Sequence, residues 1–244
     1  MSRLAFGARV PGRGHWRQRR RKARLDERRR NHYVPASMEC SVSTKSRGRP
    51  REFDPDAALA SALRVFWKHG YEGASMAELT EAMGIAKPSL YACFGNKEAL
   101  FKKALDLYER EKLCYIKSSL DAPTAREIAD RILRGAVKTH CGDSDPQGCM
   151  GVISSIACTT EAESIRQEVL ARRASSEAAV VDRFEQAKAD GDLPENVNAK
   201  ALAQCLFTIL QGLSVKAQVG ARREELDAIV DTFLAMWPAA EPRA

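Results

Sequence analysis

The stretch GIAKPSLYACFGNKEALF, residues 84–101, constrains the fold of this chain more than any other segment. Pro88 disfavours helical backbone angles at the preceding Lys87 and fits the first turn of a new helix, so one helix has to end and another begin at this point. Gly84 is suited to the end of the earlier helix, and Gly95 to the end of the later one. The stretch therefore predicts two short helices joined by a tight turn.

Polar capping residues indicate where the neighbouring helices begin. Ser75, followed three positions later by Glu78, has the form of a capping box. Asn96 can cap a longer helix. Leu90 and Phe94 lie four positions apart, which places them on one buried face of the helix between these caps. A short helix, a turn that contains glycine and a second short helix are the outline of a helix-turn-helix, although any small helical bundle can produce this spacing.

An amphipathic helix is expected just before this pair. Asp54 can serve as its N-cap, Pro55 fits the first helical position, and Gly70 suits the residue just past its end. Its apolar residues recur at helical spacing and define one buried stripe, which consists of Leu59, Ala62, Leu63 and Phe66.

The remainder of the chain also shows helical patterns and no strand signal of any length. Thr124 begins a region in which apolar residues recur at nearly the helical period, up to about His140. Further helices are expected over residues 149–157, 162–190, 196–219 and 224–237. The chain is predicted to be all-α, with an N-terminal three-helix helix-turn-helix domain over residues 47–112 and a C-terminal helical domain over residues 113–244.

Charge is distributed unevenly along the chain. Residues 1–51 contain 16 Lys and Arg against 3 Asp and Glu, a net charge of +13, whereas the remainder has a net charge of −6. Residues 1–46 are predicted to be a basic, disordered extension, since they show no hydrophobic periodicity before Met38. Such an arm either contacts a polyanion or is a solvated tail, and the sequence favours neither. Met38 is an alternative start of the chain, because the ordered pattern begins only after it.

The cysteines and the hydropathy pattern favour a cytoplasmic protein without a membrane partner. Seven cysteines, an odd number without a C-x-x-C pair, suit free thiols in a reducing cytosol. No segment reaches the roughly 18 apolar residues of a membrane span. The arginine-rich N-terminus lacks the apolar run of a secretory signal. The cysteines are Cys40, Cys93, Cys114, Cys141, Cys149, Cys158 and Cys205.

Motifs that would indicate an enzyme are missing from the sequence. It contains no phosphate-cradling glycine loop, no nucleophile elbow and no paired-histidine metal motif. Its four histidines are scattered and form no catalytic set. We therefore expect no enzyme activity, no cofactor and no metal site.

Residues 48–105 resemble the N-terminal DNA-binding domain of the TetR family of transcriptional regulators. The segments that carry the resemblance are ALRVF, GYEGAS, the MGI turn, LYACF and KEALF. The resemblance implies about nine helices, a homodimer, and repression that is relieved when a small molecule binds the C-terminal ligand-binding and dimerisation domain. Whether the protein represses, activates or does both stays open, as do the effector and the operator sequence.

The second helix of a helix-turn-helix lies in the major groove, with its N-terminal side chains at base edges. In this chain those side chains belong to Lys87, Pro88, Ser89 and Tyr91. Lys87 can donate to guanine or phosphate, Ser89 can pair with either, and Pro88 can meet a thymine methyl group. The resemblance favours a phosphate contact for the Tyr91 hydroxyl. The alternative interpretations are that Lys87 is a solvated surface lysine and that Tyr91 is a core residue. The second is weaker, because Leu90 and Phe94 already supply the buried face of this helix.

Other candidate contacts flank the two short helices. Ser75 and Lys97 stand at helix N-termini, whose free N–H groups can meet phosphates. Arg47 and Arg49 could enter the adjacent minor groove, or belong to a solvated linker. Many family members have histidine where this chain has Cys93, which puts one phosphate contact in doubt.

Three cysteines surround the break before the apolar helix expected at residues 149–157. Cys141, Cys149 and Cys158 could sense oxidants or electrophiles, with His140 beside them. The alternative is that they are buried and inert, as most free cysteines are. Their spacing matches no metal signature.

The last two expected helices are more apolar than one core face requires, and the resemblance places a dimer interface there. The C-terminal domain has few polar anchors, which suggests an apolar or amphipathic effector. The rival interpretation is a DNA-binding protein without an effector that acts through its basic arm. Sequence-independent binding with a steep salt dependence would favour that rival.

Overall fold

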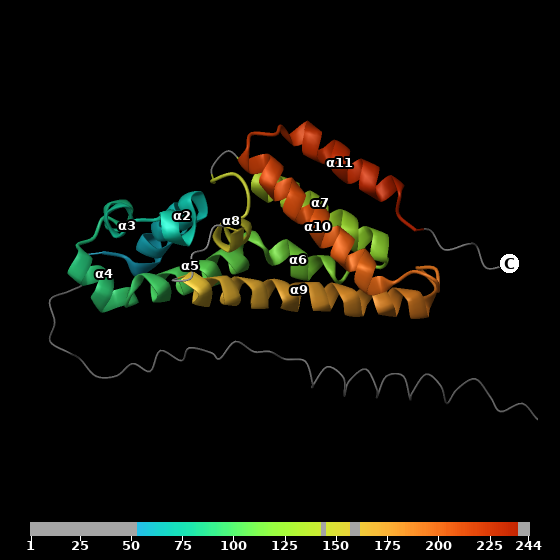
Figure 1. Cartoon of the computed structure of the whole chain (residues 1–244), viewed down its shortest axis with the longest axis horizontal. Helices are drawn as coiled ribbons and strands as arrows, with labels where there is room; N and C mark the ends of the chain where they lie inside the picture. Colours follow the sequence, from blue (N-terminus) through green and yellow to red (C-terminus); the bar gives the residue numbers. More distant parts are fainter. Residues whose placement is uncertain (1–52, 143–144, 157–161, 239–244) are drawn as a thin grey trace, which may run out of the picture. The chain divides into compact units, whose positions relative to one another are not determined.

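The structure, a computed structural model, describes residues 53–142, 145–156 and 162–238 (Figure 1). Every regular element in these ranges is an α-helix, in agreement with the predicted fold class. The predicted extension, Arg47, Arg49 and Cys158 lie outside the described residues. The helices are α2 (Pro55–Gly73), α3 (Met76–Met83), α4 (Lys87–Phe94), α5 (Lys97–Lys112), α6 (Cys114–Ser119), α7 (Ala125–His140), α8 (Met150–Ile156), α9 (Glu163–Asp190), α10 (Ala199–Gln218) and α11 (Arg223–Ala235).

The helix caps predicted from the sequence are confirmed. The side chain of Asp54 accepts a 3.0 Å hydrogen bond from a first-turn backbone N–H of α2, and Ser75 and Asn96 do the same for α3 and α5 at 3.1 and 2.8 Å. Thr124, where the sequence predicts a helical region to begin, also proves to be a cap, for α7, at 3.1 Å. Each cap satisfies a backbone donor that the helix itself cannot pair, which fixes where these helices begin.

The end predicted for the first helix is confirmed in the backbone, because helical angles stop at Gly70, and α2 reaches Gly73 only through a second helical piece that follows this kink. Gly70 has a φ of 71° and forms a kink inside the element, an angle that glycine adopts without strain. The residue that follows, Tyr71, packs edge to face against Phe101 of α5, with ring centroids 5.3 Å apart. This contact holds the final turn against the core, which the local sequence alone does not indicate.

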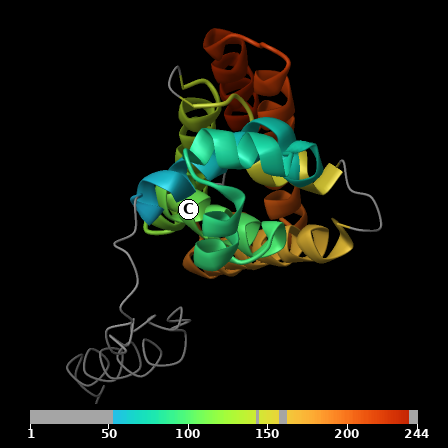
Figure 2. The same ribbon diagram turned by 90° about the vertical axis from the view of Figure 1, so that its left-hand side faces the viewer.

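The tight turn between α3 and α4 is confirmed. Gly84 adopts a left-handed conformation (φ 65°, ψ 29°) and closes α3. The chain then re-enters helix at Lys87 with Pro88 in the first turn, and Gly95 closes α4 with a φ of 80°. Figures 1 and 2 show that α2, α3 and α4 gather at one end of the described structure, away from α11.

The N-terminal helices share their hydrophobic core with helices that come much later in the chain. Met150 of α8 and Ile165 and Val169 of α9 are buried in the same cluster as the apolar faces of α2 to α5. Trp67 of α2 and Tyr108 of α5 meet edge to face in this cluster, with ring centroids 4.8 Å apart. A displacement of α8 therefore has to be accommodated by α2 and α5, since protein cores are close-packed.

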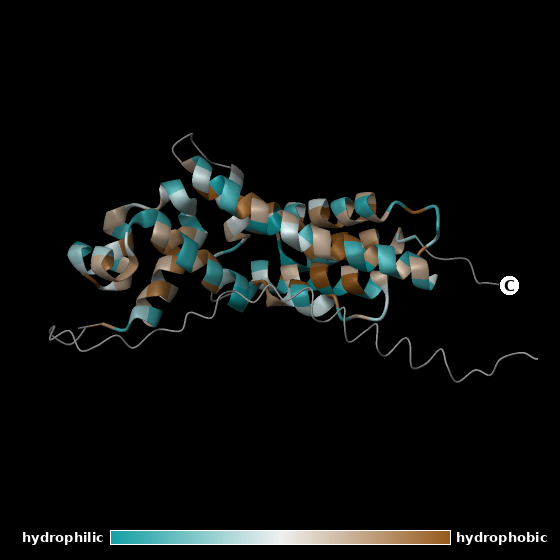
Figure 3. Ribbon diagram, turned by 90° about the horizontal axis from the view of Figure 1, so that it is seen from below, coloured by the Kyte–Doolittle hydropathy of each residue, from teal (hydrophilic) through white to brown (hydrophobic). Residues whose placement is uncertain are grey.

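A second core lies among α7, α9, α10 and α11, and includes Ile132, Phe184 and Leu206. The Asp192 carboxylate, from the loop after α9, accepts a 2.7 Å hydrogen bond from the backbone N–H of Ala125 at the start of α7. Figure 3 shows apolar and polar residues alternating along these helices, as amphipathic packing requires.

The short helix α6 was not predicted from the sequence. It has no side-chain cap, and it begins directly after the residue that ends α5. The ring of Tyr115 in α6 lies against Gly135 of α7, where a Cβ atom would overlap the ring. The helix is therefore specified by a long-range contact rather than by a local signal.

Candidate nucleic-acid interface and thiol centre

Helix α4 presents one buried and one exposed face. Leu90 and Phe94 are buried against α2, α3 and α5, while Lys87 and Pro88 are exposed and Tyr91 keeps 47% of its surface accessible. An exposed tyrosine between two buried apolar residues is not a core residue. Its ring and hydroxyl are free to meet a partner on the outer side of the helix, next to Lys87.

The N-terminus of α4 has no side-chain cap. The first-turn backbone N–H groups of Lys87 and Ser89 therefore have no intrahelical acceptor, and Pro88 has no N–H to satisfy. Donors of this kind, together with the positive end of the helix dipole, favour an anion. The start of α4 thus combines a lysine side chain with unpaired backbone donors.

Ser75 is engaged in a complete capping box. Its hydroxyl oxygen accepts from the backbone N–H of Glu78, and the Glu78 carboxylate accepts from the backbone N–H of Ser75 at 3.0 Å. These hydrogen bonds hold the pKa of Glu78 below its usual value. The hydroxyl hydrogen of Ser75 is still available for donation, so the cap and a phosphate contact are compatible.

Lys97 is positioned by a contact that the sequence does not indicate. Its ammonium group lies 4.7 Å from the centre of the Tyr71 ring, a cation–π geometry. Partial burial lowers the pKa of Lys97. Tyr71 thus holds this lysine at the N-terminus of α5. The only feature of the sequence that could have indicated this contact is the aromatic residue directly after Gly70.

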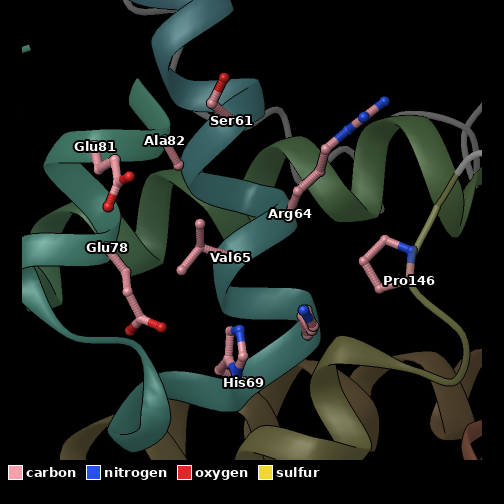
Figure 4. A pocket seen from close by; sticks show the side chains of 9 residues that line it. Ser61, Arg64, Val65, His69, Glu78, Glu81, Ala82 and Pro146 are labelled. Atoms are coloured by element: carbon pink, nitrogen blue, oxygen red, sulfur yellow. The ribbon is translucent and has the colours of Figure 1, made fainter. Parts of the chain in front are cut away.

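An open hollow of about 520 Å³ lies beside this region, between α2, α3 and the segment after α7 (Figure 4). Arg64, Lys68 and His69 of α2 and Glu78 and Glu81 of α3 line it, with Val65, Ala82 and Pro146 between them. Its walls carry both positively and negatively charged side chains. They do not match the apolar or amphipathic effector that the sequence suggests. We assign no ligand to it.

The segment between two of the predicted sensor cysteines is bound to the N-terminal helices. The Trp67 Nε1–H donates a 2.8 Å hydrogen bond to the Gly148 carbonyl, and the Asp145 carboxylate pairs with Lys112 of α5 at 2.6 Å. A second basic residue, Arg64 of α2, lies 3.9 Å from Asp145. The segment before α8 is therefore fixed to both α2 and α5.

Cys141 and Cys149 flank this segment but have different surroundings. The backbone N–H of Gly148 donates to the carbonyl of His140 at 3.4 Å, which brings the two flanks side by side. Cys141 is partly buried against the second core, and burial raises the pKa of its thiol while the charge of Arg223 lowers it. Cys149 instead packs against the core shared by α2 to α5.

Two tyrosine hydroxyls are buried without a hydrogen-bond partner, and neither tyrosine was selected from the sequence. One is the hydroxyl of Tyr108, which belongs to the core against which Cys149 packs. The Tyr115 hydroxyl is also buried without a hydrogen-bond partner. Burial raises the pKa of both phenols, so both stay protonated at neutral pH. We call Cys149 and Tyr108, which share one core, the thiol centre.

Comparison with known proteins identifies the family. Residues 58–104 match the family described as bacterial regulatory proteins, tetR family, and residues 130–233 match the tetracyclin repressor-like C-terminal domain. The chain is 37% identical over 204 residues to the HTH-type transcriptional repressor ComR of Escherichia coli, which covers 80% of this chain and 93% of that protein. The chain belongs to the TetR family.

Two further transcriptional regulators are similar over most of the chain. The HTH-type transcriptional repressor BdcR of Escherichia coli is 28% identical over 183 residues, 74% of this chain and 87% of that protein. A cysteine-substituted form of the TetR family transcriptional regulator CifR, solved with 26-base-pair operator DNA, is 44% identical. That match covers 78% of this chain and all of the CifR chain, with a TM-score of 0.75. As a TetR-family member, this chain is a DNA-binding transcriptional regulator and not an enzyme.

The two apolar helices expected at a TetR-family dimer interface also supply intramolecular core. Leu206 and Leu213 of α10 and Leu226 and Val230 of α11 are buried within the single chain. Val215, near the end of α10, is 42% exposed. The surplus of apolar residues noted in the sequence is thus only partly available to a second copy.

Neither a metal cluster nor a membrane span is found in the described ranges. Among residues 53–142, 145–156 and 162–238, no three His, Cys, Asp or Glu side chains group in a way that could hold a metal ion. None of the helices in the same ranges is both long and apolar enough to cross a membrane.

Proposed function

We propose that this TetR-family chain is a dimeric repressor that binds a double-stranded operator through α3 and α4 and is released by a small-molecule effector. The observation that carries the proposal is the exposed face of α4, where Lys87 and Tyr91 lie opposite a buried apolar pair. The DNA-binding domain would span residues 47–112 and the effector-binding and dimerisation domain residues 113–244. Cytoplasmic location follows from this function and the free thiols.

The proposed DNA contacts divide into two kinds. Lys87, Pro88 and Ser89 would meet base edges in the major groove. Tyr91, Ser75 and Lys97 would fix the register through phosphates, as hydroxyls and helix N-termini do. Arg47 and Arg49 would reach the neighbouring minor groove.

Selection of bound DNA from a random pool, followed by footprinting of the selected sequence, tests this proposal. We expect one palindromic site that is protected by the wild-type chain and not by Lys87→Ala. Lys200→Ala, which removes an exposed lysine from α10, is the matched control and should bind normally. Equal protection of unrelated sequences, with a steep salt dependence, would support the rival in which the basic arm binds any DNA.

A dimer would place two copies of α4 on successive major grooves, about 34–36 Å apart. The partly exposed apolar residues of α10 support an interface formed by α10 and α11. Light scattering at micromolar concentration should give twice the mass of one chain. A monomeric mass would contradict this part of the proposal.

We further propose that the effector acts on thiols, with Cys149 as the main sensor and Cys141 as a second thiol. Cys149 follows Gly148, whose carbonyl is bound by Trp67 of α2. Two of the positions substituted in the CifR form lie eight apart, which is also the separation of Cys141 and Cys149. Cys158 stays a prediction for the same role.

Operator release by electrophiles tests the thiol proposal. Cys149→Ser should bind the operator as the wild type does and resist release. Cys205→Ser, which removes an exposed cysteine of α10, should be released normally. Unchanged release of Cys149→Ser would rule out Cys149 as the sensor and leave the DNA-binding proposal intact.

A further inference from the structure

We infer that Arg172 is a positioning residue that sets the half-site spacing which the operator must have. Its guanidinium holds the helices that carry the proposed DNA contacts in a fixed position relative to the C-terminal helices. This inference rests on the proposed dimeric repressor, and it adds a determinant of operator choice that belongs to the C-terminal domain.

Arg172 of α9 is the centre of a charged cluster that joins two helices. Its Nη1 lies 2.7 Å from Oδ1 of Asp106 and 2.9 Å from Oε2 of Glu109, both on α5. Its Nε donates to the Glu168 carboxylate of its own helix at 2.8 Å. Glu168 thus orients the guanidinium plane, and the rigid group directs its remaining hydrogen bonds across to α5. We call these four residues the α5–α9 clamp.

The clamp differs from an isolated surface ion pair. The side chain of Arg172 is only 25% exposed and that of Glu109 only 37%. Burial raises the pKa of Glu109, and the charge of Arg172 opposes this shift. Exposed pairs contribute little by themselves, whereas a network with good geometry can hold its members in one arrangement. Loss of Arg172 would take away the positive charge next to a half-buried carboxylate.

Helix α9 is shared by the two cores of the structure. Ile165 and Val169 are buried in the core of α2 to α5, whereas Val180 and Phe184 are buried in the core that includes α7, α10 and α11. Arg172 lies between these two groups in the sequence. Figure 1 shows α9 as one long helix that begins near α5 and continues along α10. The clamp therefore fixes α5 to a helix whose other half is built into the C-terminal domain.

The position of α5 determines where the helix α4 lies in the proposed dimer. Because α4 and α5 share one core, a shift of α5 moves α4 as well. Successive half-sites lie about 34–36 Å apart, so each base pair inserted between them moves one half-site by about 3.4 Å and rotates it by about 35°. A rigid junction between α5 and α9 rejects such a change, and a loosened junction tolerates it.

Affinity for operators of different spacing tests the inference in the full-length protein. The DNAs are the operator selected from a random pool and two versions with one base pair inserted or deleted at its centre. The wild type should lose about tenfold or more in affinity with either change, because the DNA would have to deform. Arg172→Met keeps an apolar side chain and should reduce this loss about three- to fivefold, the scale of a partly exposed charged network.

Two further variants separate the clamp from general effects of charge. The double variant Asp106→Asn, Glu109→Gln should tolerate altered spacing as Arg172→Met does, although it changes the net charge in the opposite direction. The ratio of affinities between the DNAs cancels the nonspecific effect of charge on DNA binding. Arg166→Met is the matched control, since Arg166 pairs with Glu163 of its own helix α9 at 3.3 Å. It should discriminate between the spacings as the wild type does.

Two outcomes would overturn the inference. Discrimination at the wild-type level in both clamp variants would overturn it and leave the proposed function intact. Equal binding of all the DNAs by the wild type would contradict the proposed dimer as well. Circular dichroism verifies that each variant is folded. If Arg172→Met does not fold, the double variant, which replaces two carboxylates by amides of the same shape, supplies the measurement.

Discussion

The indole Nε1–H of Trp67 donates a 2.8 Å hydrogen bond to the carbonyl of Gly148, a residue 81 positions later in the chain. Both groups are buried. The bond joins the longest helix of the N-terminal group to the residue that precedes Cys149. It is a direct hydrogen-bonded link between α2 and the segment that carries the proposed sensor thiol.

Trp67→Phe should destabilise the protein and weaken the communication between these two sites. The substitution leaves the Gly148 carbonyl without its indole donor, which costs about 1–3 kcal/mol. It also removes part of a buried ring. Chemical denaturation measures the stability, and operator release by the electrophile methyl vinyl ketone measures the coupling. Release as complete as in the wild type at the same degree of alkylation would show that the bond carries no signal.

Gly148→Ala should be among the most disruptive single substitutions in the described chain. Gly148 has a φ of +85°, and a Cβ there would lie 3.1 Å from the Gln218 Cβ and 3.2 Å from the Ser214 carbonyl oxygen. Gly220→Ala is the matched control, since Gly220 has a φ of +90° with no atom near the new methyl group. We expect about 1 kcal/mol of backbone strain in both variants and a further loss in Gly148→Ala. Equal melting temperatures would contradict the packing argument.

Stability should fall as the pH is lowered from about 6.5 to about 4, in part because of His140. Burial lowers the pKa of His140 from its ordinary 6.5 to about 4, so the unfolded chain binds a proton in this window while the folded chain does not. The loss from this group approaches about 3 kcal/mol at the acid end and vanishes above pH 7. Denaturation of wild type and His140→Gln at several pH values isolates the effect. The difference in the free energy of unfolding between wild type and His140→Gln should shrink as the pH is lowered.

Lys87→Ala and Tyr91→Phe should weaken operator binding in different ways. If Lys87 contacts a base, Lys87→Ala relaxes the sequence preference at one base pair of the operator. If Lys87 contacts a phosphate, the salt dependence of the affinity becomes shallower by about one released counterion. Tyr91→Phe removes only a hydroxyl, so we expect a loss of roughly 0.5–1.5 kcal/mol without a change in preference. Fluorescence anisotropy at several salt concentrations distinguishes these results. Unchanged affinity in both variants would place the interface elsewhere.

Local signals were sufficient for the helices other than α6 and for the turn between α3 and α4. Caps at Asp54, Ser75, Asn96 and Thr124 depend on residues within a few positions, so they can be identified from the chain alone. The exposed and buried faces of α4 also follow from local spacing.

Contacts between distant segments could not be identified in this way. The turn after Gly70 depends on packing of Tyr71 against α5, and α6 depends on a space that Gly135 leaves open. Tyr108 and Tyr115 looked like ordinary core residues. What distinguishes them is that their hydroxyls lack acceptors, and this is a property of the three-dimensional surroundings.

The core that α8 and α9 share with α2 to α5 has a consequence for protein engineering. Met150, Ile165 and Val169 would be left without their packing partners if the first four helices were exchanged for those of a relative. Three exposed apolar side chains amount to several kcal/mol of lost burial, enough to unfold a marginal chimera. A designer who wishes to give this protein a new operator should therefore substitute the outer face of α4 and leave the domain junction intact.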